Sequence, residues 1–107
     1  TAPTVLKQIP LSDEHWRWIA EGMRAAVSGA GGTGRAAQLP GIPVAGKTGT
    51  AEDPPRPKPH AWFIGYAPAD NPRIALAVVV EQGGSGGAVA APIARRILEA
   101  FFPPEAP

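Results

Sequence analysis

The sequence of 107 residues has no cysteine, no long apolar run and a formal net charge of only +1. Without cysteine there are no disulfides and no thiolate metal sites, and the chain is compatible with an oxidising as well as a reducing compartment. The charge gives no field that selects nucleic acid or an anionic membrane. The longest apolar run, residues 74–80, is far shorter than the roughly 20 residues of a membrane-spanning helix, and no signal-peptide pattern is present. We therefore expect any membrane anchor or export signal to lie outside this chain.

The length limits the chain to one domain, or a part of one, with a modest core. Its 13 glycines and 14 prolines gather between periodic segments, so we interpret them as turns rather than as signs of disorder. No internal repeat is visible in the sequence.

A helix is predicted after Ser12, which is a favourable N-cap residue. From Trp16 to Val27 apolar residues recur at steps of three and four, which predicts one apolar stripe on a helix that ends at Gly29. Glycines in the following loop, residues 29–34, allow positive φ there. Residues 1–10 are too short to assign, and an entering strand is one interpretation.

Three strands are predicted at residues 44–51, 61–67 and 73–81. The third is almost entirely apolar, so we expect it to be covered on both faces. The prolines of residues 54–59 exclude a helix or a central strand from the first connection. The connections are too short for parallel crossovers, which need a dozen or more residues, so the strands should be antiparallel.

A last helix is predicted from apolar residues at steps of four between Val89 and Phe101. Pro92 is tolerated only in the first turn of this helix, and Pro103 and Pro104 end it. The predicted order is helix, three antiparallel strands, helix. This order is an α+β fold with helices packed on an antiparallel sheet.

Lys47 lies in a stretch that fits two motifs with different chemistries. Residues 41–48 match the phosphate loop G-x-x-x-x-G-K-[ST], and residues 47–49 match the K-T-G element of penicillin-recognising acyl-serine enzymes. A phosphate loop needs a helix to open at the Lys-Thr pair, but Gly49, Thr50 and Ala51 follow, which disfavours one. On a strand beside a cleft, the ammonium would hold a substrate carboxylate, hydroxyls would donate hydrogen bonds, and Gly49 would leave room for an extended peptide.

Several separated stretches together resemble one family. The sequence resembles the C-terminal part of the transpeptidase domain of class B penicillin-binding proteins, and is most similar to penicillin-binding protein 2 of the elongation type. The resemblance covers almost the whole chain. The matching stretches are EGMRAAV (21–27), GGTG (31–34), GKTGTAE (46–52), HAWFIGYAP (60–68), IALAVVVE (74–81) and GGAVAAPI (86–93).

This resemblance implies part of a penicillin-binding and β-lactamase-like transpeptidase fold. It implies a D,D-transpeptidase that cross-links peptidoglycan stem peptides ending in D-Ala-D-Ala through an acyl-serine intermediate, and that binds β-lactams. Such an enzyme needs no cofactor and no metal, and its partners include no nucleic acid. It works on the extracytoplasmic face of the cytoplasmic membrane, anchored by an N-terminal segment outside this chain, beside a glycosyltransferase of the elongation machinery.

The resemblance also implies roles for four consecutive residues. Lys47 corresponds to a catalytic lysine beside the nucleophilic serine and the serine of an S-x-N element. Thr48, Gly49 and Thr50 correspond to substrate-binding residues, with the Thr50 hydroxyl nearest the carboxylate of the acyl donor. The backbone N–H of Thr50 corresponds to one of the two oxyanion donors.

The chain departs from the family pattern in its serines. It has three, Ser12, Ser28 and Ser85, none with lysine three residues later, and no S-x-N is present. We therefore interpret residues 1–107 as an incomplete C-terminal fragment of one transpeptidase domain, inactive alone, whose partner is the remainder of the domain.

Other interpretations stay open at this point. Within the same fold, the chain is compatible with a β-lactamase or D,D-carboxypeptidase relative. The prolines of residues 54–59 are also compatible with a noncatalytic binding module. His60 precedes the aromatic strand, and we interpret it as a locally hydrogen-bonded loop histidine rather than a catalytic base.

Overall fold

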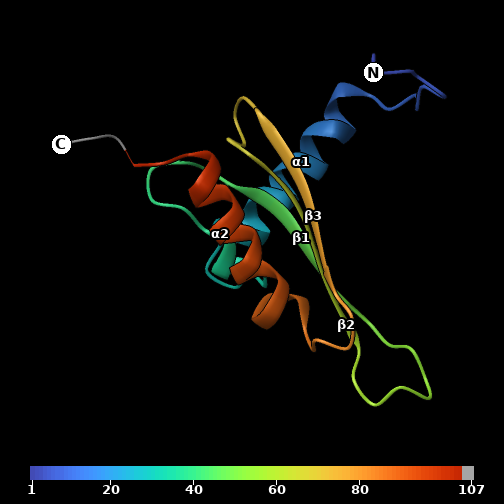
Figure 1. Cartoon of the computed structure of the whole chain (residues 1–107). Coiled ribbons are helices and arrows are strands. Elements are labelled where there is room, and N and C mark those ends of the chain that lie inside the picture. The colour runs from blue at the N-terminus through green and yellow to red at the C-terminus, as the bar shows by residue number, and fades with distance from the viewer. Residues whose placement is uncertain (105–107) are drawn as a thin grey trace.

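The computed structural model describes residues 1–104, which form two layers, a sheet and helices (Figure 1). The elements in chain order are α1 (Asp13–Ser28), the 3₁₀ turn η1 (Arg35–Ala37), β1 (Ala45–Ala51), β2 (His60–Ala67), β3 (Ile74–Val80), the π turn η2 (Gly86–Ala90) and α2 (Ala91–Phe101). This order confirms the predicted α+β fold. Residues 1–12 contain neither helix nor strand, so the interpretation as an entering strand is wrong.

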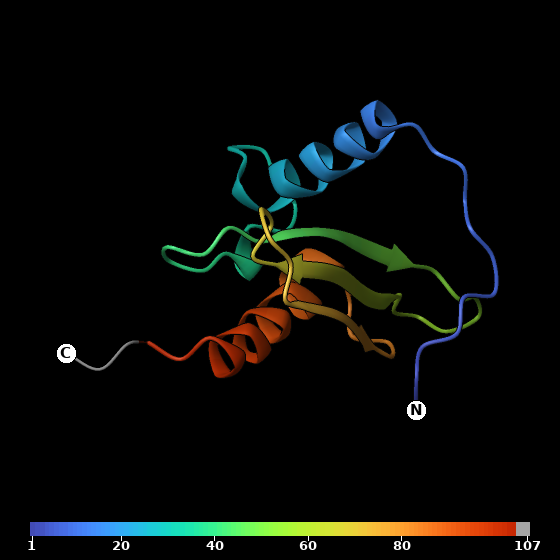
Figure 2. The same cartoon turned by 90° about the horizontal axis from the view of Figure 1, so that it is seen from above.

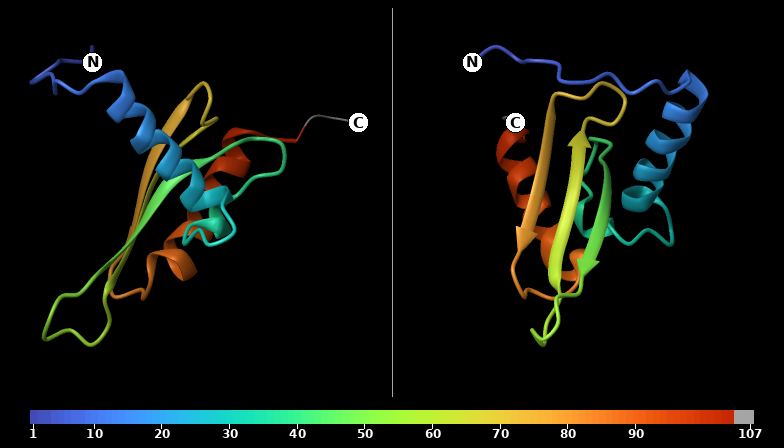
Figure 3. Two further views of the ribbon diagram at one scale, coloured as in Figure 1. Left: turned by 180° about the vertical axis from the view of Figure 1, so that it is seen from behind. Right: turned by 90° about the vertical axis from the view of Figure 1, so that its right-hand side faces the viewer.

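The sheet is antiparallel throughout, with the strand order β1-β2-β3. Thr48 in β1 lies opposite Phe63 in β2, which in turn lies opposite Val78 in β3. Side chains alternate between the two faces of a strand, so this row of three lies on one face. The right-hand view of Figure 3 shows the sheet face-on, with α1 beside β1 and α2 behind the sheet.

The core lies between this face of the sheet and α2, and Phe63 is its largest fully buried side chain. From α2 the core receives Ala91, Ala94 and Leu98, which are all fully buried. The two small alanines let the helix lie close to the sheet. Figure 2 shows α2 under one face of the sheet, while α1 runs along the β1 edge.

The prediction that the third strand is covered on both faces is wrong. Val79 is 50% exposed, and the neighbouring outward residues Ala75 and Ala77 are exposed as well. The reason is that, among residues 1–104, a helix layer covers only the face that carries Phe63. Trp62 and Ile64 of β2 lie on the same open face, 41% and 47% exposed.

The helices also bury less of their apolar surface than periodicity alone would indicate. In α1 only Val27, near its C-terminal end, is buried, while Trp16 and Ile19 are about half exposed. In α2 the residues at steps of four, including Ile93 and Ile97, are exposed beside the stripe that packs on the sheet. No helix within residues 1–104 has both the length and the apolar character needed to cross a membrane.

Helix ends follow the predicted residues. The Ser12 hydroxyl caps α1 by accepting from the His15 N–H at 3.2 Å, and Gly29 ends it by donating to the Ala25 carbonyl at 2.8 Å. Pro92 lies in the first turn of α2, as predicted. The glycines of residues 29–34 do not use the positive φ that they allow, and the glycines with positive φ are Gly41 and Gly84.

Two glycine substitutions test this packing, and we expect them to change the free energy of unfolding in opposite directions. A Cβ at position 46 would lie 2.3 Å from Phe63 Cζ and 2.8 Å from the Ile64 carbonyl oxygen. We expect Gly46→Ala to lower the free energy of unfolding by about 1–3 kcal/mol, since the buried ring and the backbone cannot both move away. The measurement is urea denaturation followed by circular dichroism.

Gly22→Ala is the matched control, because a Cβ there meets nothing within 4 Å. It lies inside α1, where alanine should raise the free energy of unfolding by about 0.5–1 kcal/mol. A Gly46→Ala variant as stable as the parent would contradict the described packing of Phe63 on β1.

Candidate active-site strand

The four residues singled out by the sequence lie next to one another in β1, at one edge of the sheet. The Lys47 and Thr50 side chains are exposed, and Thr48 and Gly49 are half-buried. The strand continues through Thr48 to Ala51, so no helix opens at the Lys-Thr pair. The phosphate-loop interpretation needs that helix, and the structure therefore excludes it.

The strand register divides these residues between the two faces of the sheet. Lys47 lies opposite Ile64, and Gly49 lies opposite Trp62, which places both on the open face. Thr48 and Thr50 fall between them and turn toward the side that α2 and η2 cover. The sequence places the four residues side by side, but it did not predict which of them lie on which face of the sheet.

The Lys47 ammonium has one hydrogen bond, donated by Nζ to the Thr48 carbonyl oxygen at 2.7 Å. Within residues 1–104 no carboxylate forms an ion pair with it. An ammonium group carries three donors, so two remain for other acceptors. Lys47 can therefore bind an anion above the open face without breaking an existing ion pair.

The Thr48 hydroxyl is bonded to a residue that the sequence analysis gave no role. Its Oγ1 lies 2.8 Å from Oγ1 of Thr33, in the loop after α1. The backbone of Gly87 also lies against Thr33, since a Cβ at position 87 would be 2.5 Å from the Thr33 carbonyl oxygen. Thr33, in the loop after α1, thus contacts both β1 and η2. Its place in the GGTG stretch was the only sequence signal for it.

The Thr50 hydroxyl faces the first residue of η2. Its Oγ1 accepts a hydrogen bond from the Gly86 N–H at 3.3 Å, which leaves the hydroxyl proton free to be donated. The contact between the two backbones is close, because a Cβ at position 86 would lie 2.5 Å from the Gly49 carbonyl oxygen. The backbone of η2 therefore supports β1 from behind at Gly49 and Thr50.

Beyond the end of β1, a polar cluster joins the β1–β2 loop to the loop after β3. His60 Nε2 lies 3.0 Å from Oδ2 of Asp53, and Nη1 of Arg56 lies 3.0 Å from the same oxygen. The Gln82 N–H donates to His60 Nδ1 at 2.9 Å. These contacts agree with the interpretation of His60 as a locally hydrogen-bonded histidine. The proline segment 54–59 begins and ends at this cluster.

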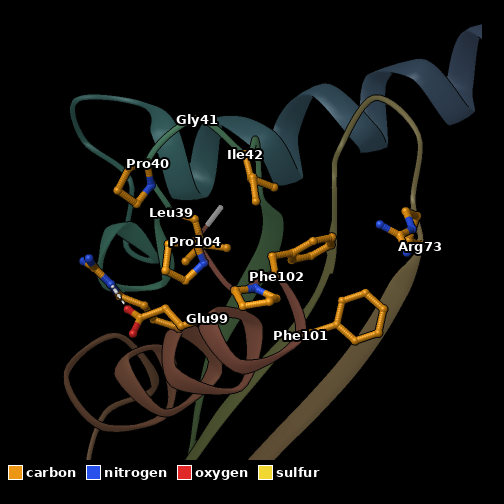
Figure 4. Close-up of a pocket in the computed structure, with 11 residues that line it drawn as sticks. Leu39, Pro40, Gly41, Ile42, Arg73, Glu99, Phe101, Phe102 and Pro104 are labelled. Atoms are coloured by element: carbon orange, nitrogen blue, oxygen red, sulfur yellow. Dashed lines mark hydrogen bonds and ion pairs between the residues drawn. The ribbon is translucent and has the colours of Figure 1, made fainter. Parts of the chain in front are cut away.

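A large hollow near the start of β1 does not include the candidate strand. It encloses about 840 Å³ and is lined by Leu39, Ile42, Arg73, Phe101 and Phe102, among others, but by none of residues 47–50 (Figure 4). The Arg73 guanidinium lies 5.6 Å from the ring centre of Phe101 and 5.7 Å from that of Phe102. This hollow lies where β1 and β3 begin, so its volume does not identify the candidate site.

Comparison with known proteins agrees with the strand and the fold. Residues 1–99 match the family model of the penicillin binding protein transpeptidase domain. The chain is 51% identical over 70 residues to the peptidoglycan D,D-transpeptidase PbpA of Mycobacterium tuberculosis, an alignment that covers 58% of this chain and 14% of that protein. The chain thus spans only a small part of the curated relatives that it matches.

Solved structures share the fold over most of the chain. The structure of Pseudomonas aeruginosa PBP2 in complex with WCK 5153 matches with a TM-score of 0.82 and 42% identity, covering 96% of this chain and 22% of that one. The penicillin G acyl-enzyme complex of penicillin-binding protein A from M. tuberculosis matches with a TM-score of 0.70 and 41% identity, covering 86% and 21%. The antiparallel sheet with its two helices is therefore part of the transpeptidase fold, and the chain belongs to the penicillin-binding protein transpeptidase domain family.

Proposed function

We propose that this chain is the C-terminal part of a longer D,D-transpeptidase that cross-links peptidoglycan stem peptides through an acyl-serine intermediate. The observation that carries the proposal is the position of Lys47 and the next three residues on an exposed edge strand, with the ammonium free of any carboxylate in the described part of the chain. Residues 1–107 form one part of a single domain, and the remainder of that domain supplies the S-x-x-K and S-x-N elements.

The reaction proceeds in two acyl transfers. The serine hydroxyl attacks the carbonyl of the penultimate D-Ala, its proton passes to the leaving amine of the terminal D-Ala, and an ester forms. The amine of a second stem peptide then attacks this ester, loses a proton and regenerates the serine. In each step negative charge gathers on the carbonyl oxygen, where two N–H donors stabilise it. The N–H of Thr50 is one of these donors.

Lys47 favours the proton transfers at the serine through its positive charge. Gly49 lies beside Lys47 on the open face, and because it has no side chain, a substrate can approach the strand backbone there. A Cβ there would already lie 3.2 Å from Cβ of Trp62. The Thr48 and Thr50 hydroxyls bind the carboxylate end of the substrate, and the free hydroxyl proton of Thr50 supports that assignment.

The longer protein acts on stem peptides ending in D-Ala-D-Ala and is acylated by β-lactams. The acyl-enzyme complexes of penicillin-binding protein A with penicillin G and imipenem support this, since those proteins share the fold. An N-terminal segment anchors the protein at the extracytoplasmic face of the cytoplasmic membrane. A cell-wall glycosyltransferase of the elongation machinery supplies the glycan strands.

Labelled penicillin tests the proposal directly. We expect the longer protein to form a covalent adduct that survives denaturation, measured by gel fluorescence and by intact mass. The 107-residue chain alone should form none, because no nucleophilic serine with lysine three residues later is present in it. Persistent absence of an adduct on the longer protein would falsify the proposal, and fast turnover of a chromogenic β-lactam would indicate a β-lactamase instead.

Replacement of Lys47 separates function from folding. We expect Lys47→Met in the longer protein to lower the acylation rate by about 100-fold or more, as loss of a positioned electrostatic group does. The thermal midpoint should stay unchanged, because the ammonium forms no ion pair among residues 1–104. Lys7→Met, at an exposed position far along the chain from β1, is the control and should acylate like the parent. Equal acylation of the Lys47→Met protein would contradict the assigned role.

A further inference from the structure

His60 joins loops that follow two different strands of the sheet. It is the first residue of β2 and lies opposite Ala51, the last residue of β1. Through Nε2 it contacts Asp53 in the β1–β2 loop, and through Nδ1 it contacts the Gln82 N–H just after β3. Its side chain is only 20% exposed. Both ring nitrogens therefore form hydrogen bonds inside the protein, although the proposed acyl transfer assigns His60 no role.

The two contacts fix the tautomer of the ring. The backbone N–H of Gln82 is a donor, so Nδ1 must be the acceptor and carry no proton. The proton of the neutral imidazole then lies on Nε2 and is donated to Oδ2 of Asp53 at 3.0 Å. Arg56 donates to the same oxygen, also at 3.0 Å, and holds the carboxylate in place. The result is a directed series of hydrogen bonds from Arg56 and His60 to Asp53, and from Gln82 to His60.

The segment that His60 holds leads to the candidate strand. Gln82 has a φ of 49°, an uncommon left-handed conformation for a residue other than glycine, and its hydrogen bond to Nδ1 helps maintain it. Two residues later the Gly84 N–H donates to the Pro59 carbonyl at 3.1 Å. After two more residues the Gly86 N–H reaches the Thr50 hydroxyl, and the Gly86 backbone lies against Gly49. The position of residues 82–86 thus determines how the Gly86 backbone contacts Gly49 and Thr50.

We propose that His60 is a positioning residue for acyl transfer, which it serves by fixing residues 82–86 behind the Thr50 N–H. This inference rests on the proposed function, in which that N–H binds the oxyanion. Oxyanion stabilisation depends on donor geometry, and small displacements of catalytic groups lower rates strongly. A displaced segment would mainly slow the acylation step and leave initial binding of the β-lactam intact.

Two substitutions of His60 each keep one of its two contacts and remove the other. An asparagine amide oxygen can take the place of Nδ1 and still accept from the Gln82 N–H, while the bond to Asp53 is lost. A glutamine amide nitrogen can take the place of Nε2 and still donate to Asp53, while the acceptor for Gln82 is lost. Only the Gln82 contact leads on to Thr50, so a positioning role predicts that asparagine restores more activity than glutamine.

The experiment measures β-lactam acylation of the longer protein by stopped flow, with the rate constant of acylation separated from the dissociation constant of the preceding complex. We expect His60→Gln to lower the rate constant about 10-fold and His60→Asn about 2- to 3-fold, with dissociation constants within about 2-fold of the parent. His15→Gln is the control, since His15 is an exposed residue of α1, and it should acylate like the parent. If His60→Gln fails to fold, Asp53→Ala tests the role through the other contact, because a ring without its Asp53 bond is held less firmly. Its rate constant should fall about 2- to 3-fold, as in His60→Asn, which loses the same bond, and an unchanged rate constant would contradict the role.

The outcomes separate the two proposals. A parent protein that forms no acyl-enzyme contradicts the proposed function itself. A parent that acylates normally, with His60→Gln equally fast, contradicts the positioning role alone. The same holds if asparagine and glutamine lower the rate equally and in proportion to lost thermal stability, since that result indicates only a structural contribution.

Discussion

The close contact between the Gly86 backbone and β1 is the constraint on which the rest of the candidate site depends. A Cβ at position 86 would lie 2.3 Å from the Trp62 carbonyl oxygen and 2.5 Å from that of Gly49, so no larger residue fits without moving the sheet or η2. An edge strand has neighbours on one side only and is otherwise free to bend. Here η2 and the bond from the Gly86 N–H to Thr50 restrain it from behind. The strand can therefore stay exposed at Lys47 and still keep a fixed geometry.

This arrangement gives the two faces of β1 different tasks. The covered face carries Thr48 and Thr50, whose hydroxyls are bonded to Thr33 and Gly86 and so connect the strand to the loops beneath it. The open face carries Lys47 beside the apolar side chains of Trp62 and Ile64. In the proposed function, the Lys47 ammonium acts at the serine that the remainder of the domain supplies.

Local sequence patterns predicted the elements well but not their long-range contacts. The Ser12 cap, the stop at Gly29 and Pro92 in the first turn of α2 are local signals, and all three were confirmed. Periodicity does not say which apolar stripe another element covers, so β3 was wrongly expected to be buried on both faces. Thr33 and Thr48 lie 15 residues apart, His60 and Gln82 22 apart, and Thr50 and Gly86 36 apart. No local pattern joins such pairs, and only the fold brings them together.

The central claim is that η2 supports β1 from behind and so holds the Thr50 N–H in the position where, in the proposed function, an oxyanion forms. The most direct measurement is a crystal structure of the longer protein acylated by penicillin, with the distance from Thr50 N to the acyl carbonyl oxygen as the test. The account predicts a hydrogen bond of about 2.7–3.1 Å, with Gly86 still against Gly49. An acyl carbonyl oxygen bound by other donors, beyond hydrogen-bonding distance of Thr50 N, would contradict it.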